Sequence, residues 1–156
     1  MATVPLPPAL PDSIRRIASG AGRLAYYTNV QDPGAGIATG AGTVSAHPLL
    51  LIHSINAAGS AFEVRPTYLH FRATRPVYAL DLPGFGMSDR SDRVYTPAVF
   101  QQAIIDLLER IGSPADVIAL SLGSEFAASA ALASSSAKTC TWVRRSSSAT
   151  SRKNAS

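Results

Sequence analysis

The sequence has 156 residues, of which 46% are hydrophobic and 15% charged, a composition typical of one ordinary globular domain. This excludes a collagen-like chain. Because Cys140 is the only cysteine, an internal disulfide and a cysteine-rich metal site are excluded as well. No apolar run approaches the roughly 20 residues that a membrane-spanning helix needs, so we expect no membrane span.

The formal net charge of +4 arises at the C-terminal end of the sequence. Residues 134–156 hold five of the 14 lysines and arginines and no acidic residue, which leaves nine basic and ten acidic residues in the first 133. A nucleic-acid-binding domain usually gathers basic residues on one face. The first 133 residues are close to neutral, so we expect no nucleic-acid partner.

The two ends of the sequence differ in composition from the middle. Residues 1–22 open with prolines and are predicted to be a flexible leader in a cytoplasmic protein, with an organellar transit peptide as the alternative. Residues 134–156 are basic and rich in serine, without an apolar period, and are predicted to be disordered. The abrupt change near Ala133 suggests a shifted reading frame or aberrant splice, with an ordinary interaction tail as the alternative.

The middle of the sequence, residues 23–133, alternates predicted strands and helices. Short apolar runs predict the strands and 3.6-residue periodicity predicts the helices. We expect strands at 23–30, 49–53, 76–82 and 116–120, and helices at 60–74, 96–111 and 122–133. This order predicts an α/β fold, a mainly parallel sheet between two layers of helices.

Local signals mark where two of these helices begin and end. Ser60 and Glu63 have the spacing of a capping box, in which the glutamate reaches back to the serine N–H, and the helix is expected to restart at Pro66. Thr96 is a predicted N-cap for the next helix and Gly112 ends it. That helix carries one apolar stripe: Phe100, Ala103, Ile104, Leu107, Leu108 and Ile111.

A small-x-Ser-x-Gly pattern, from Ala119 to Gly123, lies between the last predicted strand and its helix. A turn this tight needs small residues on both sides, and it projects the central side chain, Ser121, above the sheet. The serine then meets a helix N-terminus, whose free N–H groups favour an anion. The pattern therefore predicts a nucleophilic serine at 121.

Three motifs in order carry a family resemblance. They are His53-Ser54, Asp81-Leu-Pro-Gly-Phe-Gly-Met-Ser88 and the 119–123 turn. On these motifs, residues 23–133 resemble the N-terminal half of the α/β-hydrolase superfamily, in its serine-nucleophile branch. The resemblance implies a partial α/β-hydrolase fold that acts on a small-molecule acyl substrate.

The resemblance also implies roles for individual residues. Ser121 is the expected nucleophile, and the backbone N–H groups of Leu122 and Ile55 are the expected oxyanion hole. Ser54 stands where the family usually has glycine. The serine at 121 disfavours the members that use an aspartate there, such as epoxide hydrolases.

The remaining polar residues of these motifs are expected to have structural roles. We expect His53 to be a hydrogen-bonded residue at a strand end, Asp81 to anchor the following turn, and Glu125 to brace neighbouring loops. His47 and His70 are expected at the surface. No metal site is expected. No cofactor is expected either, because the glycines at 34, 36 and 40 do not match the dinucleotide-binding fingerprint.

In the family the catalytic acid and then the histidine follow the serine. After Ser121 this sequence has Glu125 as its only acid and no histidine. A serine hydroxyl without a base is a weak nucleophile, so we expect the chain to be truncated and inactive alone.

Two alternatives to an inactive half-enzyme stay open. One is a working enzyme whose histidine and acid come from a partner chain or whose base is an unusual residue. The other is a non-catalytic interaction protein with a basic tail. Without the family's later strands, residues 116–120 should form an exposed sheet edge through which the chain can self-associate.

Overall fold

The computed structural model describes residues 7–31 and 47–134, and the backbone of residues 139–143. Six strands form one sheet in the order β1-β2-β4-β3-β5-β6. The pairs β1–β2 and β2–β4 are antiparallel, while β3 pairs with β4 and β5, and β5 with β6, in parallel. The strands are β1 (Ser13–Ser19), β2 (Gly22–Thr28), β3 (Leu49–Ile52), β4 (Val77–Asp81), β5 (Asp116–Leu120) and β6 (Thr139–Val143).

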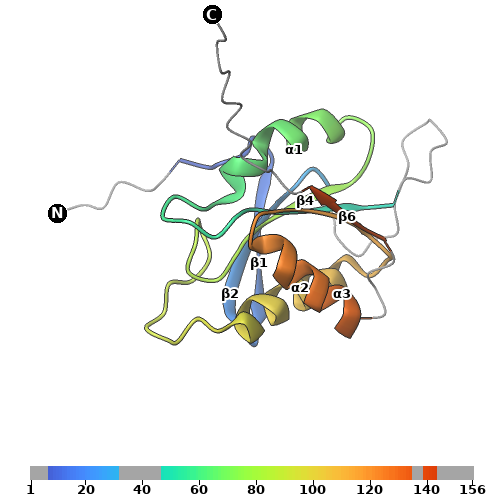
Figure 1. Ribbon diagram of the computed structural model, residues 1–156. Helices are drawn as coiled ribbons and strands as arrows, with labels where there is room; N and C mark the ends of the chain where they lie inside the picture. Colours follow the sequence, from blue (N-terminus) through green and yellow to red (C-terminus); the bar gives the residue numbers. More distant parts are fainter. Residues whose placement is uncertain (1–6, 32–46, 135–138, 144–156) are drawn as a thin grey trace, which may run out of the picture.

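Helices cover both faces of this sheet (Figure 1). The short 3₁₀ helix η1 (Ala61–Val64) leads into α1 (Arg65–Phe71) on one face, and α2 (Pro97–Ile111) and α3 (Gly123–Ala133) lie on the other. Every residue of β3 and β4 is buried, as expected for parallel strands covered on both sides. The predicted three-layer α/β fold is confirmed.

The helices lie close to their predicted positions, but their predicted capping hydrogen bonds differ from those in the structure. The whole apolar stripe of α2 is buried, and Gly112 ends the helix in the left-handed region at φ 72°. Thr96 is the N-cap residue, as predicted, but its side chain does not make the capping hydrogen bond. Helix α1 begins next to Pro66, which confirms the predicted restart. No helix in the described ranges is long and apolar enough to cross a membrane.

The segment predicted to be a flexible leader contains a regular strand. Strand β1 pairs with β2 along its whole length, from Ser13 opposite Thr28 to Ser19 opposite Gly22. Its side chains are only half-buried or exposed, so its hydrophobic alternation is weak. The pairing with β2 holds the strand in place, and a single segment of sequence does not reveal such a pairing.

Strand β6 lies beyond the boundary predicted at Ala133. It pairs in parallel with β5, with Asp116 opposite Thr139 and Leu120 opposite Val143. The expectation that β5 would be the exposed edge of the sheet is therefore wrong, because β6 covers it. The other residues of the predicted tail, apart from Ser134, lie outside the described residues.

Asp81 organises the turn that follows β4. Its carboxylate, which is fully buried, accepts hydrogen bonds from the N–H groups of Ala61 (2.7 Å) and Met87 (2.9 Å). Ser88 Oγ donates to the Asp81 carbonyl oxygen and accepts from Ala25 N–H at 2.8 Å. The predicted role of Asp81 as an anchor of this turn is confirmed.

The close packing around Asp81 predicts a large effect of one glycine substitution. A Cβ atom at Gly86 would lie 2.1 Å from Asp81 Cγ, and Gly86 has a φ of +50°. We expect Gly86→Ala to lower the free energy of unfolding by about 3 kcal/mol, from the clash and the backbone strain together. Urea unfolding followed by circular dichroism measures this loss.

Gly20→Ala is the matched control, because a Cβ atom there meets only Gln102 Cγ at an ordinary 3.6 Å. Its unfolding midpoint should stay within experimental error of the unsubstituted chain. Equal midpoints for the two variants would contradict the packing described for the Asp81 turn.

Candidate active site

Ser121 lies at the corner between β5 and α3, with its side chain exposed. Its φ is 50°, and among the described residues it is the only one other than glycine with a positive φ. This conformation costs an L-amino acid about 1–2 kcal/mol. Strained backbone of this kind concentrates at functional sites, where the surrounding structure holds it in place.

The corner is tight because α3 begins directly against the end of β3. A Cβ atom at Gly123 would lie 2.3 Å from the carbonyl oxygen of His53 and 3.1 Å from Ile52 Cγ2. On the other side of the serine, Ala119 is buried and lies opposite Ile52 in the sheet. Only a residue without a side chain fits at 123, which is the steric condition that the sequence pattern implied.

The two predicted oxyanion-hole residues lie on segments that leave the same edge of the sheet. Strands β3 and β5 are parallel neighbours, with Ile52 opposite Ala119, so the loop holding Ile55 and the corner holding Leu122 both follow the carboxyl ends of their strands. Within the described part of the chain, neither Ile55 N–H nor Leu122 N–H donates a hydrogen bond. Both are available to a ligand oxygen.

His53 is a buried structural residue, as predicted. Its side chain is fully buried, and ring atom Nδ1 lies 2.7 Å from the Ser54 carbonyl oxygen while Nε2 accepts from Leu82 N–H at 3.0 Å. Nδ1 must therefore carry the proton. The ring also contacts Phe85 edge-on at 5.4 Å between centroids. Burial lowers the pKa of His53, so the ring is neutral and neither nitrogen is free to act as a base.

Glu63 reaches a different partner from the one predicted. Its Oε2 accepts from Ser54 N–H (3.2 Å) and Ser54 Oγ–H (2.6 Å), and its Oε1 accepts from Asn56 Nδ2–H (2.7 Å). The predicted capping box is therefore not formed, because Glu63 does not reach the Ser60 N–H and the serine oxygen does not accept from the third N–H of the helix. Ser60 Oγ does cap the helix, accepting from Phe62 N–H at 3.3 Å.

These bonds keep Glu63 ionised. Burial acts to raise the pKa of Glu63, but the hydrogen bonds from Ser54 and Asn56 outweigh it, so the pKa lies below its usual value. The sequence did carry a signal for this contact. Two polar residues, Ser54 and Asn56, flank the predicted oxyanion residue, and an acid follows on the first turn of the next helix.

The other polar residues singled out in the sequence take no part in the hydrogen bonds of His53 and Glu63. Glu125, His47 and His70 are exposed. The predicted bracing role of Glu125 has no support, since its side chain makes no hydrogen bond or ion pair within the described residues. No group of three His, Cys, Asp or Glu side chains in the described ranges could hold a metal ion.

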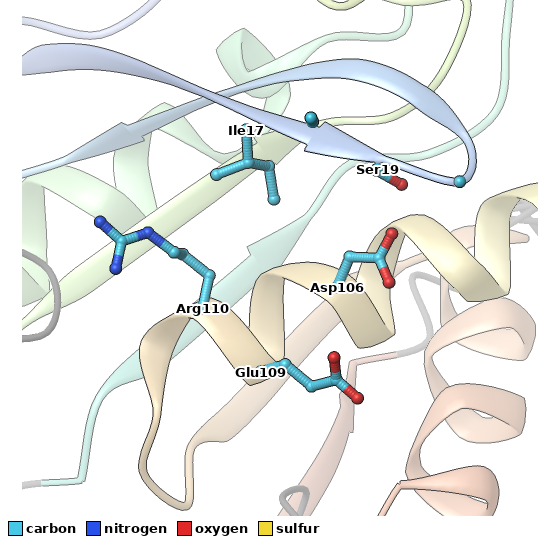
Figure 2. Close-up of a pocket in the computed structure, with 7 residues that line it drawn as sticks. Ile17, Ser19, Asp106, Glu109 and Arg110 are labelled. Atoms are coloured by element: carbon cyan, nitrogen blue, oxygen red, sulfur yellow. The ribbon is translucent and has the colours of Figure 1, made fainter.

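Two hollows in the described part of the chain lie away from Ser121. One, of about 710 Å³, lies beside the loops 56–60 and 84–87 and includes Arg90. The other, of about 680 Å³, lies between β1 and α2 and is lined by Ile17 of the strand and by Asp106, Glu109 and Arg110 of the helix (Figure 2). Ser121 thus lies at an exposed corner in the described part of the chain.

Comparison with known proteins gives one family match and several matches in fold. The sequence model of the alpha/beta hydrolase family matches residues 49–149, which is more than half of the chain. The match extends past the boundary that the sequence predicts at Ala133. No curated protein matches the sequence.

Several solved structures share the fold. A serine hydrolase involved in carbazole degradation has a TM-score of 0.66 at 16% identity, covering 84% of this chain and 47% of its own. A meta-cleavage product hydrolase from Pseudomonas fluorescens IP01 has a TM-score of 0.61 at 22% identity, covering 78% and 41%. The Cif epoxide hydrolase from Acinetobacter nosocomialis has 0.63 at 20%, covering 83% and 37%. The chain spans less than half the length of each.

The backbone strain at Ser121 predicts an unusual order of stability between two variants. Ser121→Gly and Ser121→Ala both remove the hydroxyl, but only glycine adopts a φ of 50° without cost. We expect the glycine variant to be more stable than the alanine variant by about 1 kcal/mol in urea unfolding. At Ser129, an exposed position inside α3, the same pair should show the reverse order by a similar amount. The same order at both positions would contradict a strained conformation at Ser121.

The buried, neutral ring of His53 predicts a dependence of stability on pH. The pKa of His53 is lowered from 6.5 in the folded chain, so below about pH 6.5 the unfolded chain binds a proton that the folded chain excludes. The free energy of unfolding should be highest above this pH and fall between pH 7 and 5. The lowered pKa values of Asp12 and Glu63 act only below about pH 4.5.

Chemical unfolding at several pH values measures this slope. His53→Gln should remove it, while His70→Gln, at an exposed position on α1, should keep it. A slope that His53→Gln leaves unchanged would show that another group is responsible.

Proposed function

Since this chain belongs to the alpha/beta hydrolase family, we propose that it carries the nucleophile and the oxyanion hole of an enzyme that hydrolyses esters or related acyl bonds. The observation that carries this proposal is the strained φ of Ser121 at the corner between β5 and α3. The proposal is supported by the exposure of Ser121 and by the N–H groups of Leu122 and Ile55, neither of which donates a hydrogen bond within the described residues.

The proposed reaction proceeds through an acyl-enzyme. Ser121 Oγ attacks the acyl carbon, and the carbonyl oxygen becomes an oxyanion that accepts hydrogen bonds from Leu122 N–H and Ile55 N–H. The N-terminus of α3 adds a favourable partial positive charge. The alcohol leaves with a proton, and water then hydrolyses the acyl-enzyme, which restores the Ser121 hydroxyl. Removal of one such donor from another enzyme raised the barrier by roughly 3 kcal/mol.

Serine at position 121 favours acyl-bond hydrolysis over the other reactions that proteins of this fold catalyse, such as epoxide hydrolysis. The structural neighbours include a serine hydrolase and an epoxide hydrolase, and at these identities the likeness concerns the fold alone. Acyl transfer needs a hydroxyl with oxyanion donors beside it, and the proposal assigns these parts to Ser121 and to the N–H groups of Leu122 and Ile55. The residues at the corner therefore favour acyl-bond hydrolysis.

Turnover needs a base, and within the described residues no side chain makes a hydrogen bond with the Ser121 hydroxyl. No histidine follows Ser121 in the sequence, and both ring nitrogens of His53 are engaged. In a serine protease, loss of the histidine lowers turnover by about a millionfold, while the oxyanion hole alone retains roughly a thousandfold rate enhancement over water. We therefore propose that the 156 residues alone form covalent adducts slowly and do not turn over.

A fluorophosphonate probe tests this proposal. We expect slow labelling over hours at high probe concentration, confined to Ser121 by peptide mass spectrometry and absent in Ser121→Ala. Ser129→Ala is the matched control, since it removes an exposed hydroxyl from the same helix and should label like the unsubstituted chain.

Two outcomes would contradict the proposal. Equal labelling of the unsubstituted chain and Ser121→Ala would show that Ser121 is not the nucleophile. Labelling at the rate of a complete serine esterase would show that a base acts within these 156 residues.

A further inference from the structure

We propose that Glu63 is a positioning residue that aims the Ile55 N–H into the oxyanion hole by holding the residues on both sides of it. The inference rests on the proposed function, because it assigns a task to Glu63 only if Ile55 N–H receives an oxyanion. The contact itself does not depend on that assignment.

One carboxylate bonds to both ends of residues 54–56, which we call the oxyanion loop. Glu63 Oε2 accepts from both the N–H and the Oγ–H of Ser54, and Oε1 accepts from the side-chain amide of Asn56. Ile55 is the single residue between these two partners. The peptide plane that carries the Ile55 N–H also contains the Ser54 carbonyl oxygen, which lies 2.7 Å from His53 Nδ1. The bonds of Glu63 to the residues on both sides of Ile55 further limit the rotation of this plane.

Serine at position 54 is central to this contact. Its Oγ donates to Glu63 Oε2 at 2.6 Å and lies 2.5 Å from Asn56 Nδ2, which donates to it. Glycine, the residue usual in the family at this position, could provide neither bond. The side chain of Asn56 is used at both ends, since its Oδ1 accepts from Ala58 N–H at 2.8 Å.

Glu63 is itself held by the buried end of β4. It lies on η1, and the N–H of Ala61, the first residue of η1, donates to the Asp81 carboxylate at 2.7 Å. On the far side of the loop, a Cβ atom at Gly59 would lie 2.8 Å from the Ser54 carbonyl oxygen, so the loop packs closely against itself. The Glu63 carboxylate therefore connects the end of β4, through Asp81 and η1, to the loop that holds Ser54, Ile55 and Asn56.

A positioning role and an electrostatic role of Glu63 predict opposite effects when its charge is removed. A carboxylate near an oxyanion repels it, so removing the charge alone should strengthen the binding of an anionic adduct. Removing the positioning should weaken that binding. Glu63→Gln does both at nearly constant shape, because its amide nitrogen cannot accept a hydrogen bond, and the direction of the change shows which effect is larger.

Titration of the ¹⁵N-labelled full chain with phenylboronic acid provides the measurement. Ser121 Oγ adds to boron and its proton passes to water, which leaves a tetrahedral boronate anion that mimics the oxyanion without any catalytic base. In the unsubstituted chain we expect both the Ile55 and the Leu122 amide signals to shift downfield with boronate. In Glu63→Gln we expect the Ile55 shift to be lost, the Leu122 shift to persist, and the boronate to bind about tenfold more weakly.

Three variants serve as controls. Glu109→Gln removes a carboxylate from an exposed position on α2 and should behave like the unsubstituted chain. Ser121→Ala should abolish both shifts. Asn56→Ala keeps Glu63 but removes one of its partners at an exposed position, and it should reduce the Ile55 shift even if Glu63→Gln fails to fold.

The outcomes separate failure of the inference from failure of the proposed function. If neither amide responds in the unsubstituted chain, the oxyanion hole itself is wrong. If both respond but Glu63→Gln retains the Ile55 shift or binds boronate more tightly, the hole stands and the role of Glu63 is overturned. If Glu63→Gln fails to fold, an unchanged Ile55 shift in Asn56→Ala overturns the role in the same way.

Discussion

The approach of Gly123 to the carbonyl oxygen of His53 is the constraint on which the candidate site depends. Because α3 starts against the end of β3, the chain leaving β5 must reverse within two residues, and Ser121 takes up the left-handed conformation. The same contact places the corner beside the loop that begins at His53. One steric condition thus produces both the exposed hydroxyl and the proximity of the corner to the loop after β3.

Two buried polar residues, His53 and Asp81, hold the loops around this corner. His53 joins the end of β3 to Leu82 at the end of β4, and Asp81 joins β4 to η1 and to the turn at Met87. Each side chain has all its hydrogen-bonding atoms in use, which stabilises buried polar groups and favours one arrangement of the loops. Residues that resemble catalytic groups by type therefore act here as structural connectors.

The elements that could be predicted from sequence are those whose signals are local. The apolar stripe of α2 and the buried runs of β3 and β4 follow from hydrophobic periodicity, and the small residues around Ser121 follow from the tightness of the turn. Strand β1 and the contacts of Glu63 were harder to predict, because their signals are not local. The former depends on pairing with β2, and the latter depends on folding that brings η1 against the loop after β3.

The geometry of the site separates charge stabilisation from proton transfer. Charge stabilisation needs only the ends of two adjacent parallel strands, the first turn of α3 and the loop held by Glu63, and these elements lie close together in the described part of the chain. Proton transfer needs a group that reaches Ser121 Oγ, and His53 cannot supply it because both ring nitrogens are occupied. The proposed oxyanion hole can therefore be probed by itself with a boronate, whereas turnover depends on a second and independent set of residues.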